Sequence, residues 1–195
     1  VERLVTRLAP KAAYQQISTG TNETQLEMLA KLQLDDEIHH ALKLFAEQKG
    51  IQFMSTAFDS QSLAFLAYDL GLDILKIPSG EITNFPLLTH IARKKKPMIM
   101  STGMAYIGEV EAAVRVIEDA GNTEIVLLHC VSNYPANPED INLRAMASMS
   151  AAFRVPVGYS DHTTGIEIPI SAVALGARVI EKHLTLDRSH PPGSN

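Results

Sequence analysis

The sequence contains a single cysteine and no tryptophan, and it has no long apolar run. One cysteine cannot form a disulfide within the chain, which excludes a disulfide-stapled scaffold. No stretch of eighteen apolar residues occurs, so a membrane-spanning helix is not expected. The chain also lacks a Gly-x-Gly-x-x-Gly or Walker motif, which argues against a nucleotide site. Acidic residues outnumber basic ones by 22 to 17, and this balance disfavours nucleic acid as a partner.

Of the 195 residues, 46% are apolar and 20% are charged, as in ordinary globular domains. This apolar content is enough to bury a core and excludes a disordered chain. No N-terminal segment has the charge and apolar pattern of a signal peptide, so we expect a cytoplasmic protein.

Short runs rich in Ile, Val, Leu and Met alternate with segments of helical period along most of the chain. The runs begin near Ile51, Asp73, Pro97, Glu124, Val155 and Ala177. Between them the spacing predicts helices over residues 62–70, 109–120 and 166–175, the last ended by Gly176. Upstream, helices are expected over residues 23–34 and from Asp35 or Asp36 to Lys49, closed by Gly50. This alternation indicates βα units around a parallel sheet.

Polar side chains follow each of the six predicted strands. In a barrel or an open parallel sheet, the carboxyl ends of the strands converge on the face that holds the active site. Several hydroxyls and one lysine at these ends suit a phosphate group. They are Thr56, Ser79, Ser101, Ser132 and Ser160, with Lys76. The alternative for any single strand end is an ordinary turn, because serine and its polar neighbours favour turns.

Two histidines, His162 and His183, end consecutive strands, and two imidazoles with open positions suit a catalytic divalent metal. For His183 taken alone, a core histidine bonded to backbone is the alternative. Glu81 fits either an acid–base group or an acid at a helix N-terminus. We interpret three further features as structural: His39-His40 as solvated helix surface, 93–96 as cations at a helix C-terminus, and Cys130 as a buried thiol.

These motifs resemble, in order and spacing, the sialic acid synthase family, which condenses phosphoenolpyruvate with N-acetylmannosamine or related sugars. The resemblance extends along nearly the whole chain and includes stretches 9–15 and 25–29. Its most specific parts are 76–84, with the sequence Lys-Ile-Pro-Ser-Gly-Glu-Ile-Thr-Asn, and the Ser-Asp-His-Thr of 160–163. The other matching stretches are 55–59, 101–104, 127–130, 133–135, 157–159 and 181–187.

The resemblance implies an α/β fold, a TIM (β/α)8 barrel of which about six βα units are present, resembling the third to eighth strands. Residues 1–195 would be a partial synthase barrel without the family's antifreeze-like C-terminal domain. A barrel buries its edges only by closing, so we expect this segment alone to expose strand edges and to be inactive. The full-length protein is expected to be a homodimer.

The resemblance also implies the site. It places Mn²⁺ or Mg²⁺ on His162 and His183, and phosphoenolpyruvate on Thr56, Lys76, Ser79, Ser101, Ser132 and Ser160. It places the sugar near Asn22, Glu81 and Tyr134, with Asn195 where the family has a sugar-binding aspartate. Glu81, His162 and His183 would be the catalytic residues of an N-acetylneuraminate synthase.

Three alternatives remain open from the sequence. The first is a synthase of pseudaminic or legionaminic acid, which are related nine-carbon sugar acids. The second is a metal-dependent, aldolase-like barrel that uses pyruvate. The third is a non-catalytic fragment that binds a sugar or a partner.

Overall fold

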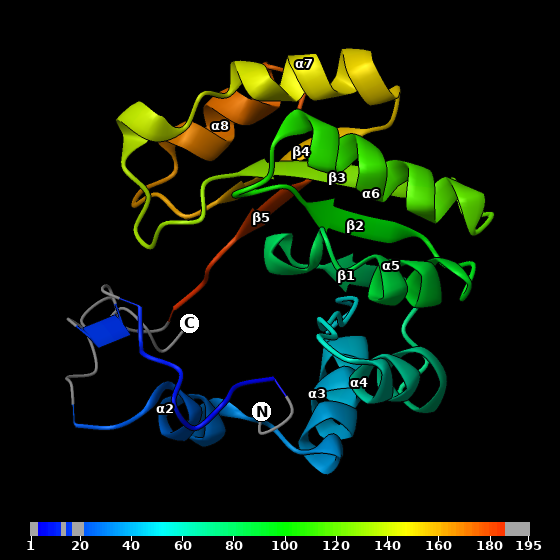
Figure 1. Cartoon of the computed structure of the whole chain (residues 1–195), viewed down its shortest axis with the longest axis vertical. Coiled ribbons are helices and arrows are strands. Elements are labelled where there is room, and N and C mark those ends of the chain that lie inside the picture. Colours follow the sequence, from blue (N-terminus) through cyan, green and yellow to red (C-terminus); the bar gives the residue numbers. More distant parts are fainter. Residues whose placement is uncertain (1–3, 13–14, 17–21, 186–195) are drawn as a thin grey trace. The chain divides into compact units, whose positions relative to one another are not determined.

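The computed structural model describes residues 4–12, 15–16 and 22–185 of the chain (Figure 1). The chain falls into two compact units, which are Val1–Phe53 with His183–Asn195, and Met54–Lys182. Asn195 lies outside the described residues. No helix in the described ranges is long and apolar enough to cross a membrane.

The described part of the first unit includes two helices, and the second of them begins and ends at the predicted caps. Helix α2, Gln25–Leu32, begins at Thr24, whose hydroxyl accepts from the Glu27 N–H at 3.2 Å while the Thr24 N–H donates to Glu27 Oε2 at 2.8 Å. Helix α3, Asp36–Gln48, is capped by the Asp35 carboxylate and is followed by Gly50 at φ +69°. His40 is exposed on α3, as expected for solvated surface.

The second unit is built on five parallel strands in the order β1-β2-β3-β4-β5 (Figure 1). Every adjacent pair is parallel, as the βα alternation predicts. The strands are β1 (Leu75–Ile77), β2 (Met98–Ser101), β3 (Ile125–Cys130), β4 (Val157–Asp161) and β5 (Ile180–Lys182).

The helices predicted over residues 62–70, 109–120 and 166–175 are present with small shifts at their ends, and two further helices, before β2 and before β4, had no predicted bounds. Helix α4, Ser60–Ala64, continues as a single π-helical turn, η1, over Phe65–Asp69, where one regular helix was predicted. Two short 3-10 turns, η2 and η3, precede α5 and α7. The remaining elements are η2 (Ser79–Glu81), α5 (Phe85–Ala92), α6 (Ile107–Asp119), η3 (Pro138–Asp140), α7 (Arg144–Phe153) and α8 (Glu167–Ala174). The basic run 93–96 follows the last turn of α5, as predicted.

The count of six strands is wrong for this structure, which is a parallel α/β half-barrel of five. The apolar run at Ile51 forms no strand, and its only ladder contact is an isolated bridge between Thr56 and Lys76. Ile51 itself is 63% exposed. Strand β1 is only three residues long, so the run before Thr56 has no partner along most of its length.

The two faces of the sheet differ in chemistry, because paired residues in a parallel ladder point the same way. Ile77, Met100 and Leu127 are register partners, and each is fully buried. Helices α5 to α8 pack along the sheet and contribute further buried side chains, including Leu88 and Ile117 (Figure 1). The opposite face carries Lys76, Ser101, Cys130, Ser160 and Glu181, which follow from the register and the alternation of side chains.

Gly158 is required where β4 meets its neighbours. A Cβ at this position would lie 2.2 Å from the Val179 carbonyl oxygen and 2.8 Å from Leu128 Cδ2. Since the nearer atom belongs to the backbone, a methyl group there would push β5 away from β4. This glycine therefore allows the last strand to pack against the sheet.

We expect Gly158→Ala to destabilise the protein by about 1–3 kcal/mol, the usual cost of overpacking a core. The matched control is Gly108→Ala in α6, where an added Cβ meets nothing within 4 Å. Alanine there is expected to leave the protein as stable or to stabilise it by about 0.5–1 kcal/mol, because glycine is a poor helix former. Urea unfolding midpoints check both, and an unchanged midpoint for Gly158→Ala would contradict the packing argument.

Candidate active site

The ammonium group of Lys76 is the centre of the polar face. The side chain is 8% exposed, and Nζ donates to Ser101 Oγ at 2.7 Å and to the Ile77 carbonyl at 3.0 Å. The Glu181 carboxylate lies 3.7 Å away. Burial lowers the pKa of Lys76, and the negative charge of Glu181 opposes that shift.

The contact between Lys76 and Glu181 shows how strongly the sheet curves. Lys76 lies on β1 and Glu181 on β5, which are the two outer strands of the five. A flat sheet of this order would hold the two strands nearly 20 Å apart, at about 4.8 Å per step. Their 3.7 Å approach therefore means that the five strands wrap around the polar face as part of a barrel wall.

Glu181 is a site residue that the sequence analysis did not assign. Its Oε1 accepts a hydrogen bond from Ser160 Oγ at 2.7 Å, while Oε2 faces Lys76. Glu181 and Ser160 are register partners on β5 and β4. The sequence could have identified Glu181 as a site residue from the alternation of side chains in the last strand. Glu181 and Lys182 are adjacent, so they must point to opposite faces of the sheet.

The hydroxyls predicted for the phosphate fall into connected pairs. Ser79 Oγ, in the turn η2, lies 3.3 Å from Ser132 Oγ, just beyond β3. Ser101 contacts Lys76, and Ser160 joins the same group through Glu181. Thr56 is tied to Lys76 by a backbone bridge. All six predicted residues therefore lie at the ends of neighbouring segments of the second unit.

Cys130 lies on the same face and is buried, as predicted for a structural thiol. Its Sγ accepts from the Gly103 N–H at 3.1 Å. Burial raises the pKa of the thiol, so it is held in the protonated form, which is a poor nucleophile. Gly103 also faces Ser132, and an added Cβ would lie 2.4 Å from that hydroxyl.

Glu81 and Tyr134, the predicted sugar contacts, have different surroundings. Glu81 Oε2 accepts from Asn84 Nδ2 at 2.7 Å, and Asn84 is the N-cap of α5. Glu81 thus contacts the side chain of the residue that caps α5, while an acid–base role stays a prediction. The Tyr134 ring lies over the His162 ring, with centroids 4.1 Å apart. Asn22 is exposed and belongs to the first unit.

His162 makes one contact that metal-binding histidines also make. Its Nδ1 lies 2.6 Å from the Val131 carbonyl oxygen, which can only accept, so the network assigns the proton to Nδ1. Metal-binding histidines characteristically donate their second nitrogen in this way. The donor chemistry therefore fits a divalent cation. His183 belongs to the first unit, and no group of three acidic, cysteine or histidine side chains gathers among the described residues. The pairing of the two histidines stays a prediction.

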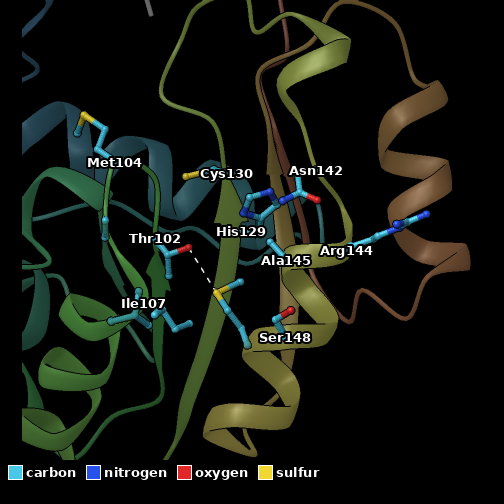
Figure 2. Close-up of a pocket in the computed structure, with 12 residues that line it drawn as sticks. Thr102, Met104, Ile107, His129, Cys130, Asn142, Arg144, Ala145 and Ser148 are labelled. Carbon is cyan, nitrogen blue, oxygen red and sulfur yellow. Dashed lines mark hydrogen bonds between the residues drawn. The ribbon is translucent and has the colours of Figure 1, made fainter.

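A cavity of about 370 Å³ lies between the ends of β2 and β3 and the N-terminal parts of α6 and α7, and Cys130 is part of its lining (Figure 2). Thr102, Met104, His129 and Met149 line it, and the Thr102 hydroxyl points toward the Met149 sulfur at 3.7 Å. None of the predicted site residues lines this cavity. The candidate site is thus the polar face around Lys76.

Several known proteins with similar sequences are named as sugar-acid synthases. The chain is 50% identical over 194 residues to the N,N'-diacetyllegionaminic acid synthase of Legionella pneumophila, covering 97% of this chain and 54% of that protein. It is 52% identical over 183 residues to the Campylobacter jejuni synthase of the same name, covering 93% of this chain and 54% of that protein. The chain thus spans about half the length of these relatives.

A solved structure supports the fold. The N-acetylneuraminic acid synthetase of Leptospira borgpetersenii, crystallised with citrate, matches with a TM-score of 0.82 at 38% identity, over 90% of this chain and 61% of that one. The NeuB family model matches residues 1–194. The resemblance drawn from the motifs is therefore confirmed, and the chain belongs to the NeuB family.

Proposed function

We propose that this chain carries the phosphoenolpyruvate-binding part of a synthase that forms a nine-carbon sugar acid and phosphate. The observation that supports it most directly is the buried Lys76 ammonium, bonded to Ser101 at the carboxyl ends of parallel strands in a NeuB-family chain. Phosphoenolpyruvate has a phosphate and a carboxylate, so a buried cation among hydroxyl donors suits it.

The names of the relatives support one choice of acceptor sugar over the other. The two at 50% and 52% identity are named N,N'-diacetyllegionaminic acid synthases, whereas the solved N-acetylneuraminic acid synthetase is 38% identical. We therefore favour the legionaminic alternative over N-acetylneuraminic acid. The acceptor would be a six-carbon sugar with two N-acetyl groups rather than N-acetylmannosamine.

The proposed reaction joins carbon 3 of phosphoenolpyruvate to the aldehyde carbon of the open-chain sugar. The electron pair of the enol double bond forms the new bond, and water adds at carbon 2, which has become electron-poor. The tetrahedral intermediate then expels phosphate by cleavage of the bond between carbon 2 and oxygen. His162 and His183 would hold a divalent metal, Mn²⁺ or Mg²⁺, which supplies Lewis-acid activation of the aldehyde when bound.

The described residues contribute orientation and charge. Two donors of the Lys76 ammonium are used by Ser101 and the Ile77 carbonyl, so the third faces Glu181 at 3.7 Å. That distance is longer than a charge-assisted hydrogen bond, and a substrate anion can compete for the same ammonium. Bound to the Lys76 ammonium, phosphoenolpyruvate would present one face to the sugar. This fixed orientation would raise the rate of reaction between the two substrates. Glu81 is our candidate for protonating the sugar oxygen.

The first test is turnover by the complete protein with purified substrates. We expect inorganic phosphate to be released from phosphoenolpyruvate only when an acceptor sugar is present, and faster with the diacetamido sugar than with N-acetylmannosamine. Incubation with a chelator should abolish release, and Mn²⁺ or Mg²⁺ should restore it. Condensation of the sugar with pyruvate, without phosphate release, would instead identify an aldolase and overturn the proposal.

The second test concerns the anion site. Lys76→Met removes a charged contact of roughly 1.5–3 kcal/mol, so kcat/KM for phosphoenolpyruvate should fall roughly 10- to 100-fold, with less effect on the KM of the sugar. Lys94→Met is the matched control, because Lys94 contacts Tyr68 at the surface and should leave both constants unchanged. An effect confined to the sugar would mean that the two subsites are exchanged.

The third test concerns the metal. His162→Ala and His183→Ala should each weaken Mn²⁺ binding measured by calorimetry, while circular dichroism shows that the fold is retained. His40→Ala, on the exposed side of α3, is the matched control. Unchanged Mn²⁺ affinity in the His183 variant would remove that residue from the ligand set.

A further inference from the structure

A buried ion pair joins β4 and β5 on the face of the sheet opposite Lys76. The Asp161 side chain is fully buried, and its Oδ2 pairs with the ammonium of Lys182, which is 27% exposed. Asp161 and Lys182 are register partners, one step beyond Ser160 and Glu181. The last two strands are thus linked by side chains on both faces.

Thr163 closes this pair into a ring. Oδ1 of Asp161 accepts from the Thr163 N–H at 3.1 Å and from its hydroxyl at 2.8 Å, while Lys182 donates to the Thr163 carbonyl at 2.9 Å. The Asp161 carboxylate therefore accepts from three donors at its two oxygens.

The ring encloses the backbone of His162, which lies between Asp161 and Thr163 in the chain. The His162 carbonyl also accepts from the Ala136 N–H at 2.8 Å, and its Nδ1 contacts the Val131 carbonyl. Lys182 in turn lies between Glu181 and His183. One ion pair therefore holds both segments that carry the predicted metal ligands and the Lys76 counter-ion.

We propose that Asp161 and Lys182 are positioning residues, which orient His162 for metal binding and Glu181 toward Lys76 from the far side of the sheet. The identity of the bound metal and substrates in this inference rests on the proposed function. The geometry does not, because the hydrogen bonds among Asp161, Thr163 and Lys182 and the contacts of His162 are seen in this chain. A purely structural pair would stabilise the two strands without controlling the imidazole.

The substitution Asp161→Asn separates these roles. Asparagine has one acceptor oxygen, so it can serve Thr163 or Lys182 but not both, and its amide N–H₂ would face another donor. Removing one partner of a buried pair also destabilises the fold, because the remaining charge is left uncompensated. The double variant Asp161→Asn with Lys182→Met removes both charges and should recover much of the lost stability.

The experiment measures Mn²⁺ affinity by calorimetry and the ¹⁵N shifts of His162 in histidine-labelled complete protein, assigned with His162→Gln. We expect both the single and the double variant to bind Mn²⁺ about 10-fold more weakly, the low end of the effect of losing a direct partner of a metal ligand, because Asp161 acts through the His162 backbone. The His162 shifts should move toward a tautomer mixture in both. Lys182→Arg should keep wild-type shifts, and Arg115→Gln, which breaks an exposed pair with Glu111 on α6, is the matched control.

The outcomes distinguish the alternatives. The positioning role would be overturned if the Mn²⁺ affinity and the His162 shifts return to wild-type values in the double variant together with its stability. It would also be overturned if neither quantity changes in any variant. If neither variant folds, the pair is a folding determinant and the proposal is also overturned. Absence of phosphate release by the wild-type protein would refute the proposed function alone, because the His162 shifts report the geometry independently.

Discussion

Burial of the Lys76 ammonium is the constraint on which the polar face depends. A buried cation needs partners, and Lys76 obtains them from β1 itself, from Ser101 on β2 and from Glu181 on β5. The two outer strands of the sheet can share one contact only because the wall is curved. The contact between Lys76 and Glu181, which partly neutralises the charge of the site, therefore forms only if the half-barrel is curved. The same curvature brings the strand-end hydroxyls around the single Lys76 cation.

The last two strands carry the site on one face and its support on the other. Ser160 and Glu181 point toward Lys76, whereas their chain neighbours Asp161 and Lys182 form the ion pair on the helix-covered side. No residue of β5 is buried, so apolar burial contributes little to holding this strand. The strand is held instead by side-chain pairs with β4 and by close packing against β4, which Gly158 allows.

Much of this architecture could be predicted from local patterns. Helix α3 begins and ends at its predicted caps, Asp35 and Gly50, because capping involves atoms within a few residues of one another. The parallel order of β1 to β5 followed from their alternation with helices. The sixth strand at Ile51 was wrong, since an apolar run becomes a strand only if a partner edge extends beside it.

The family, the parallel α/β class and the strand-end residues of the polar face can be read from the amino-acid sequence, because these depend on periodicity and on motifs in a set order. Which of those residues touch is known only from the folded chain. The contacts of Glu181 with Lys76 and Ser160 join segments from β1, β4 and β5, and their closeness depends on sheet curvature, which no local pattern encodes. Glu181 and Lys182 point to opposite faces, and the register with β4 gives Ser160 as the partner of the first and Asp161 as the partner of the second.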